Sequence, residues 1–152
     1  MVEVLIAVAI ILVSVMSLVG VHSLYLKTAL SNAEGAKAAF LAEEGLEVVR
    51  FWRDASWNNN ILGLALGTEY GLLFSGGSWA TSTEDFAVES FERSITLSAV
   101  YRDASSGDIV TSGGTLDPEA RLVESKVSWD KSGVPTTRTI STYITNLFEI
   151  EE

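Results

Sequence analysis

Few side chains in this sequence have the type and spacing that catalysis or metal binding requires. The chain has no cysteine and a single histidine, His22, so a thiolate metal site is excluded and most histidine-based catalysis lacks a second group. Glu43, Glu44 and Glu47 fall within one or two helical turns, a spacing that could pair carboxylates for metal binding or acid–base chemistry. With no histidine nearby, the three glutamates also fit a solvated helix face, and we expect that simpler arrangement.

The segment DASSGD, Asp103 to Asp108, is a second candidate site. Its oxygen-bearing side chains, among them Asp103, Ser105 and Asp108, resemble the start of a calcium loop, but the distant bidentate glutamate of the full motif is missing. A plain turn is the alternative. Since no nucleophile, base and orienting group can be assembled from the sequence, we expect neither an enzyme nor a cofactor.

Glu3 is the most distinctive ionisable residue because it lies at the start of a long apolar run. From Val4 to Leu26 no side chain carries a fixed charge, and Lys27 is the first basic side chain. A carboxylate at the edge of an apolar helix costs a few kcal/mol to bury unless a cation pairs with it. Glu3 therefore either takes its cation from another molecule or remains in a lipid head-group region as a polar flank.

The apolar run itself has the length of a membrane-spanning helix. At about 1.5 Å per residue it reaches roughly 35 Å, which exceeds the hydrocarbon layer of about 30 Å. A cleaved signal peptide would be shorter, would follow basic residues and would end in small residues; a plain membrane anchor fits the length equally well. Small residues within the run would permit close helix approach, or reflect ordinary membrane-helix composition: Ala7, Ala9, Ser14, Ser17 and Gly20.

The helical pattern continues beyond the apolar run. In residues 27–53 apolar side chains recur at three- and four-residue steps with charged residues between them, which predicts an amphipathic second half of the same helix. Gly35 and Gly45 each weaken it by about 1 kcal/mol relative to alanine. The turn-rich DASWNNN, residues 54–60, predicts the end of the helix. Residues 54–90, Gly- and Ser-rich from Ile61 onward, are expected to form a connecting loop that could include a short strand.

In residues 91–152 the spacing of apolar side chains changes from three or four residues, typical of a helix, to every second residue, which predicts a β-sheet. Phe91, Ile95, Leu97 and Tyr101 alternate with polar residues as one buried face, and similar alternation marks a second strand near Val123. After the turn DKSGVP, the segment TTRTISTYITNLF predicts a third strand. We therefore expect an α+β fold in which a long N-terminal helix, apolar in residues 1–26, packs its amphipathic half on an antiparallel sheet of about three to four strands.

The balance of acidic and basic residues argues against nucleic acid as a binding partner. The 152 residues include 20 acidic and 10 basic side chains, for a net charge of −10. The basic residues are scattered, so no electrostatic footprint for nucleic acid is evident.

Several segments resemble type IV pilins and pseudopilins of bacteria. The start MVEVLIAVAIILV is similar to the mature N-terminus of these proteins, in which one glutamate precedes an apolar helix, and LAEEGLEVVRFWRD and VSWDKSGVPTTRTISTYITNLF look like their helix and C-terminal strand segments. Mature pilins usually have four residues before the glutamate, whereas Met1 and Val2 precede Glu3 here, so the family's cleavage site and methylated first residue are not placed on this sequence. Gly20 stands where many pilins have a proline.

The resemblance implies a structural subunit of an extracellular type IV pilus-like filament. Its precursor would be inserted in the cytoplasmic membrane, and the pilus assembly machinery would polymerise it into a helical homo-oligomer at the cell surface that serves adhesion, twitching motility or DNA uptake. Glu3 would pair with the N-terminal amine of a neighbouring subunit, at Met1, and one helix face would pack in the filament core: Leu5, Ala9, Leu12, Met16 and Gly20. A pseudopilin of a type II secretion system and a non-polymerising, membrane-anchored binding module are the alternatives.

Overall fold

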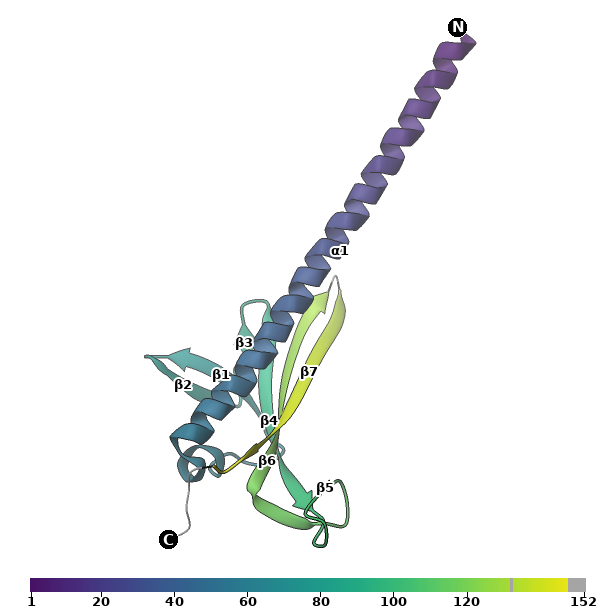
Figure 1. Ribbon diagram of the computed structural model, residues 1–152. Helices are drawn as coiled ribbons and strands as arrows, with labels where there is room; N and C mark the ends of the chain where they lie inside the picture. Colours follow the sequence, from purple (N-terminus) through teal and green to yellow (C-terminus); the bar gives the residue numbers. More distant parts are fainter. Residues whose placement is uncertain (132, 148–152) are drawn as a thin grey trace. The chain divides into compact units, whose positions relative to one another are not determined.

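A computed structural model describes residues 1–131 and 133–147 (Figure 1). In chain order the elements are α1 (Val2–Ala55), η1 (Trp57–Ile61), β1 (Glu69–Ser75), β2 (Ser78–Ser82), β3 (Ala87–Val88), β4 (Phe91–Arg102), β5 (Ile109–Val110), β6 (Thr115–Lys131) and β7 (Val134–Thr145). Tertiary contacts divide the chain into two units, Met1–Lys37 and Ala38–Glu152. Ser132 and residues 148–152 lie outside the described residues. Both belong to residues 91–152, the region expected to form the sheet, and residues 148–152 are its end.

Helix α1 ends where the turn-rich segment begins, as the sequence predicts. The Ser56 amide still donates to the Trp52 carbonyl at 3.0 Å, but the Ser56 backbone is extended, with φ −173° and ψ 119°. The Ser56 hydroxyl then accepts the backbone N–H of Asn59 at 3.2 Å and caps η1, a single π-helical turn. The stop in α1 is therefore produced by the local side-chain chemistry of Ser56 and Asn59.

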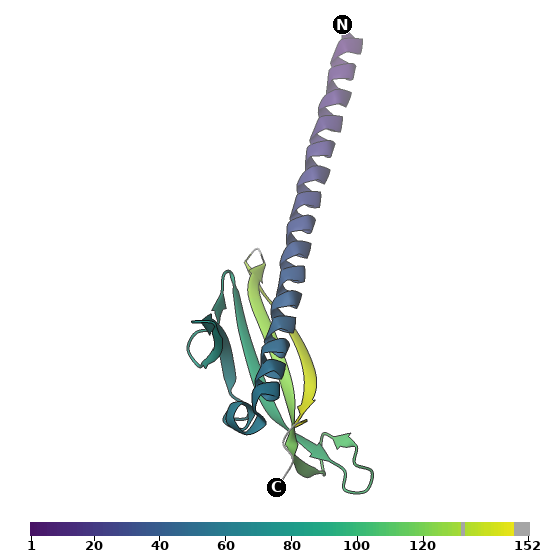
Figure 2. The same cartoon turned by 60° about the vertical axis from the view of Figure 1, so that its left-hand side comes forward.

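The strands form one antiparallel sheet in the order β2-β1-β4-β6-β7, with β3 and β5 paired to further parts of β4. The predicted α+β class is confirmed, because α1 packs on an antiparallel sheet (Figure 2). The sheet is larger than expected, with seven strands in place of three to four.

The additional strands arise mostly in residues 54–90, where the sequence suggests a connecting loop. Gly76 and Gly77 have φ values of 62° and 83°, the left-handed values that a two-residue hairpin turn requires. They join β1 to β2, and Ser75 pairs with Ser78 on either side of this turn. Because each strand has only five to seven residues, its period-two pattern is too short to be read from the sequence with certainty.

Strand β4 departs from strict alternation at one point. Its pairing with β6 shifts between Ala99 and Val100, where Pro118, Glu119 and Ala120 of β6 have no partner on β4, and the burial pattern of β4 changes phase at this irregularity. Val100 is buried, and Tyr101 is 42% exposed. The prediction that Tyr101 belongs to the buried face is therefore wrong, whereas Phe91, Ile95 and Leu97 are buried as predicted.

The core lies between one face of α1 and one face of the sheet. Ala38, Ala42, Leu46 and Val49 are buried at helical spacing. Phe40, two residues from both Ala38 and Ala42, lies off this face and is 70% exposed. Leu46 and Val49 belong to the larger of two hydrophobic clusters, to which the sheet and η1 contribute Trp57, Ile61, Leu72, Ile95, Leu97, Val123 and Ile144. Ala38 and Ala42 pack with Phe91 and Val127 in the second cluster.

At Gly45 the helix α1 lies close against the sheet. A Cβ atom added at Gly45 would lie 2.4 Å from the Ser125 Oγ atom on β6 and 3.5 Å from the Ile95 Cγ2 atom on β4. The 2.4 Å distance is too short for a contact, so any larger residue at this position requires Ser125 to move. The helix-weakening glycine noted in the sequence therefore has a packing role.

Candidate functional site

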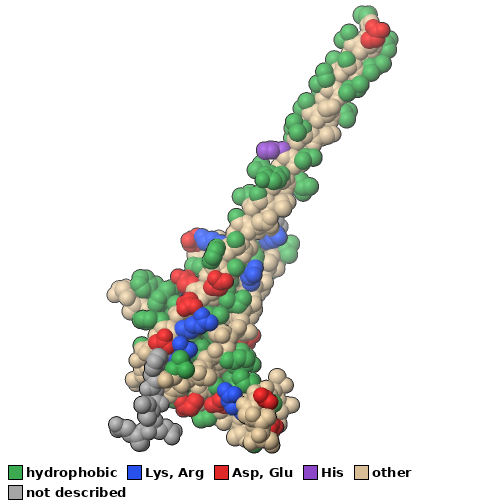
Figure 3. All heavy atoms as spheres, in the orientation of Figure 1, with side chains coloured by type: hydrophobic (Ala, Val, Ile, Leu, Met, Phe, Trp, Pro, Cys, Tyr) green, Lys and Arg blue, Asp and Glu red, His purple; other side chains and the backbone are tan. Residues whose placement is uncertain are grey.

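The apolar N-terminal run of α1 is the main candidate site, and the described residues of the chain bury none of it. By length and composition α1 is the one described helix that could cross a membrane, and its most apolar window is 0% buried. Apolar side chains follow one another along the whole run in the space-filling view (Figure 3). An ordinary core helix would be mostly buried, so this stretch is not part of the hydrophobic core of the described residues.

The exposed apolar side chains occupy all sides of this helix. Large hydrophobic residues from Val2 to Leu26 stand exposed at most positions, with no wide polar stripe between them. A helix that is apolar all round requires an apolar environment on every side, such as a membrane or the centre of a helix bundle.

The polar side chains inside the run are compatible with such an environment. The Ser14 hydroxyl donates to the Ile10 carbonyl and the Ser17 hydroxyl donates to the Val13 carbonyl, each at 2.8 Å. Thr28, just past the run, bonds the Leu24 carbonyl in the same way at 3.0 Å. These groups satisfy their hydrogen-bonding needs within the helix, so they add little to the cost of removing it from water.

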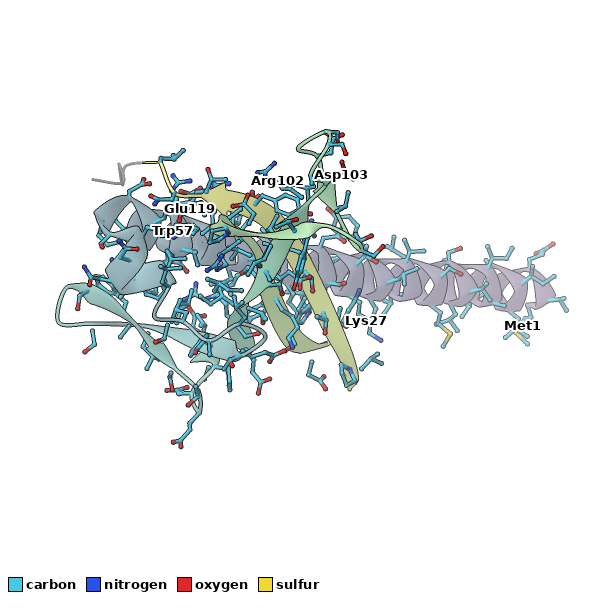
Figure 4. All side chains as sticks on the ribbon, turned by 90° about the horizontal axis from the view of Figure 1, so that it is seen from below. Met1, Lys27, Trp57, Arg102, Asp103 and Glu119 are labelled. Atoms are coloured by element: carbon cyan, nitrogen blue, oxygen red, sulfur yellow. The ribbon has the colours of Figure 1, made fainter. Side chains whose placement is uncertain are left out.

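Glu3 has no such internal partner. It lies in the first turn of α1 and is exposed. Among the described residues it makes no ion pair. Lys27, the nearest basic side chain in sequence, follows 24 residues later, or about 36 Å along a helix; Figure 4 shows Met1 and Lys27 well separated on α1. A cation for Glu3 must therefore come from the terminal amine or from another molecule.

The five residues that the resemblance assigns to helix packing lie on one face of α1, at steps of four, three, four and four. They are exposed in the isolated chain. Around Gly20 nothing lies within 4 Å of an added Cβ atom, so no intramolecular contact explains a glycine there. This face is available to a second helix, and it consists of Leu5, Ala9, Leu12, Met16 and Gly20.

The three glutamates of the second half of α1 differ in their contacts. Glu43 and Glu47 are exposed, and Glu47 pairs with Arg50. Glu44 is half exposed and forms an ion pair with Arg93 of β4, whose side chain is 2% exposed. No group of three or more His, Cys, Asp or Glu side chains that could hold a metal ion occurs in the part of the chain that the structure describes.

Arg93 is the residue that the sequence analysis missed. Its guanidinium bonds Glu44 of α1 and donates to the Leu72 carbonyl of β1 at 3.4 Å. It also lies 5.4 Å from the ring centre of Trp79 on β2. Arg93 occupies an inward position of the alternating pattern, and a basic residue at an inward position is the signal that could have identified it.

The Asp103 segment forms the turn between β4 and β5 (Figure 4). The Asp103 carboxylate accepts the backbone N–H groups of Ser105 and Ser106 at 2.8 Å and 2.9 Å. The bond from Ser106, followed by that from Ser105, lowers the pKa of Asp103 below its usual value. Arg102 braces the same turn by donating to the Gly107 carbonyl at 2.9 Å. These contacts fit the turn alternative, because the Asp103 Oδ1 atom already accepts two backbone N–H groups of the loop.

Comparison of the chain with protein-family models, with curated proteins and with solved structures finds no match. The functional assignment depends on the residues and the geometry described above.

Proposed function

We propose that this protein is a structural subunit of a type IV pilin-like filament, with residues 1–26 of α1 in the filament core and the β-sheet unit on the outside. The observation that carries the proposal is the apolar helix of membrane length that is 0% buried in its own chain and begins with the glutamate Glu3. The similarity of VEVLIA to the pilin N-terminus supports it.

Assembly would transfer the apolar helix from the membrane to a shared core. In the membrane this apolar surface is already out of water, so dispersion contacts and close packing, and not a hydrophobic term, favour its transfer to the core. Once a subunit is assembled, exposing the helix to water would cost about 25 cal/mol per Å², which opposes its release. Such a filament needs no covalent links, which agrees with the absence of cysteine from the sequence.

Glu3 would set the axial position of each subunit. A carboxylate buried without a cation is strongly unfavourable, so the register that pairs Glu3 with the terminal amine of a neighbouring subunit is preferred over registers that leave it unpaired. Since the apolar side chains surround the helix and impose little register of their own, the single charged pair supplies the specificity.

A pseudopilin of a secretion machine would use the same helix and the same carboxylate with a different set of partners. A membrane-anchored module that does not polymerise is also compatible with the exposed helix. In that case Glu3 would lie among lipid head groups, and its removal would have little effect.

The test compares filament yield among variants of Glu3. The full chain is produced in a bacterium that has a type IV assembly system, and surface filaments are counted by electron microscopy. We expect Glu3→Ala and the isosteric Glu3→Gln to abolish most filaments, while the exposed head residue Glu84 tolerates replacement by alanine. Normal yield in both Glu3 variants would contradict the proposal.

A further inference from the structure

A groove at the end of α1 has the composition of a carbohydrate-binding site. It has a volume of about 370 Å³, within the range of small-molecule sites, roughly 300–1,000 Å³. Three elements line it: the last turns of α1, η1 with the loop that follows, and β2. The lining residues are Trp52, Asn59, Asn60, Gly63, Leu64, Trp79, Ala80 and Thr81.

Among the described residues no charged side chain lines this groove, although the chain carries a net charge of −10. A phosphate, a carboxylate or an ammonium group would find no counter-ion there, so the ligand should be neutral. The lining nevertheless includes two amide side chains and a hydroxyl. A purely apolar ligand would leave these polar groups without partners, so the ligand should carry hydroxyl or amide groups.

The two tryptophans supply flat apolar surfaces. Trp79 is held in place by the Arg93 guanidinium, 5.4 Å from the ring centre, and by Phe74, whose ring centroid lies 5.1 Å away. Both tryptophans also pack against the hydrophobic core while remaining partly exposed. A tryptophan side chain that is already held by its neighbours can bind a flat apolar surface with little further loss of its own conformational entropy.

The asparagine amides are held in place as well. The Asn60 Nδ2 atom donates to the Trp52 carbonyl at 3.0 Å, and the Asn59 Nδ2 atom donates to the Ser56 hydroxyl at 3.0 Å. Each bond fixes its amide plane and leaves the Oδ1 atom as an acceptor for a ligand hydroxyl. Sugar rings combine an apolar C–H face with hydroxyl groups at the edge, which is the complement of this arrangement.

We infer that the groove binds a neutral glycan, with a sugar ring against the tryptophans and its hydroxyl groups on Asn59, Asn60 and Thr81. This inference goes beyond the structural role of the filament, because the groove lies entirely within residues 38–152 and uses none of the apolar N-terminal run. It gives the β-sheet unit a recognition function of its own.

The test titrates the full chain in detergent with lactose, with chitotriose and with mannobiose, followed by tryptophan fluorescence and saturation-transfer NMR. 3′-Sialyllactose, a charged comparator, and a neutral peptide are titrated in parallel. We expect saturable binding of at least one neutral sugar, weakened about tenfold or more by Trp79→Ala and by Asn59→Ala.

A third variant, Thr81→Trp, fills the groove from an exposed position on β2, because Thr81 projects from the same face of the strand as Trp79. It should abolish binding without depending on removal of a core side chain, and so it keeps the test informative if Trp79→Ala fails to fold. Trp129→Phe, outside the groove, should bind normally. The inference is overturned if no neutral sugar binds, if binding survives Thr81→Trp, or if only the peptide or the charged sugar binds. Filament yield of Thr81→Trp, counted separately, should stay normal, which distinguishes this result from failure of the filament proposal.

Discussion

Arg93 connects more elements of the β-sheet unit than any other polar side chain whose contacts are described above. It joins β4 to α1 through Glu44, to β1 through the Leu72 carbonyl and to β2 through the Trp79 ring. Its Nε atom is buried with no partner among the described residues. Such a residue stabilises the unit only while its charge is compensated, so the carboxylate of Glu44 matters more than its exposed position suggests.

Removal of the Glu44 carboxylate should therefore destabilise the protein. Because Glu44 is half exposed, water partly replaces it, and we expect Glu44→Ala to lower the free energy of unfolding by about 1–3 kcal/mol. The matched control is Glu47→Ala, which breaks the surface pair with Arg50 and should cost less than about 0.5 kcal/mol. Denaturant unfolding of the full chain in detergent measures both values, and equal effects would contradict this role of Arg93.

Gly45 should resist replacement although alanine is the better helix former. Gly45→Ala gains about 1 kcal/mol of helix propensity but places a Cβ atom 2.4 Å from the Ser125 Oγ atom, and overpacking of this kind costs about 1–3 kcal/mol. We expect a net loss of stability. Gly35→Ala, where nothing lies within 4 Å of the added atom, should instead be stabilising by up to about 1 kcal/mol.

The effect of Gly45→Ala should depend on Ser125. Ser125→Ala removes the Oγ atom that the new Cβ atom would meet, and Ser125 Oγ is itself buried without a partner in the described residues. Gly45→Ala should therefore cost less in the Ser125→Ala background than in the wild type. Thermal unfolding of the four proteins gives this coupling, and additive effects would disprove the proposed contact.

Asp103 should make the β4–β5 turn sensitive to acid. Its folded pKa lies below the unfolded value of 3.8 because the carboxylate accepts two backbone N–H groups. The stabilisation is fully present above pH 3.8 and is lost as the pH falls through the lower, folded pKa. Hydrogen exchange of the Ser105 and Ser106 amides should accelerate relative to other turns in that range. Asp103→Asn keeps the acceptor and should show no such transition.

At the scale of the elements, the sequence patterns predict the helix better than the sheet. The 54-residue helix α1 follows from a long run without proline, and its end follows from the polar segment at Ser56. Strand β4 is also predicted, but the shift in its pairing with β6 at Ala99 and Val100 is not, because that shift depends on the partner strand. The β1–β2 hairpin depends on a Gly-Gly turn flanked by short strands, whose pattern is too brief to stand out.

The face of α1 that contains Gly20 carries a prediction at this scale. Since nothing in the described part of the chain lies within 4 Å of an added Cβ atom at Gly20, Gly20→Leu should leave the unfolding temperature of the β-sheet unit unchanged. In a filament core the larger side chain would hold neighbouring helices apart, and we expect filament yield to fall severalfold. Thermal unfolding and electron microscopy of the same variant separate the two effects; normal filaments would exclude close packing at Gly20.

At the scale of the whole molecule, the sequence predicts two kinds of surface, and the structure describes both. The unit Met1–Lys37 exposes apolar side chains on all sides, whereas the unit Ala38–Glu152 buries its own in a core. Composition alone predicts this contrast. The groove between η1 and β2 could not be predicted, because Trp52, Asn60 and Trp79 are brought together only by the hairpin and by the turn after α1.

The central proposal is that the exposed apolar helix polymerises and that Glu3 sets its register. Electron cryomicroscopy of native surface material tests it most directly. We predict a helical filament with this chain as the repeating unit, residues 1–26 in the core, and the Glu3 carboxylate within about 4 Å of the terminal amine of a neighbouring subunit. Monodisperse particles in detergent with no filaments on the cell surface, or a filament in which Glu3 faces solvent, would contradict the account.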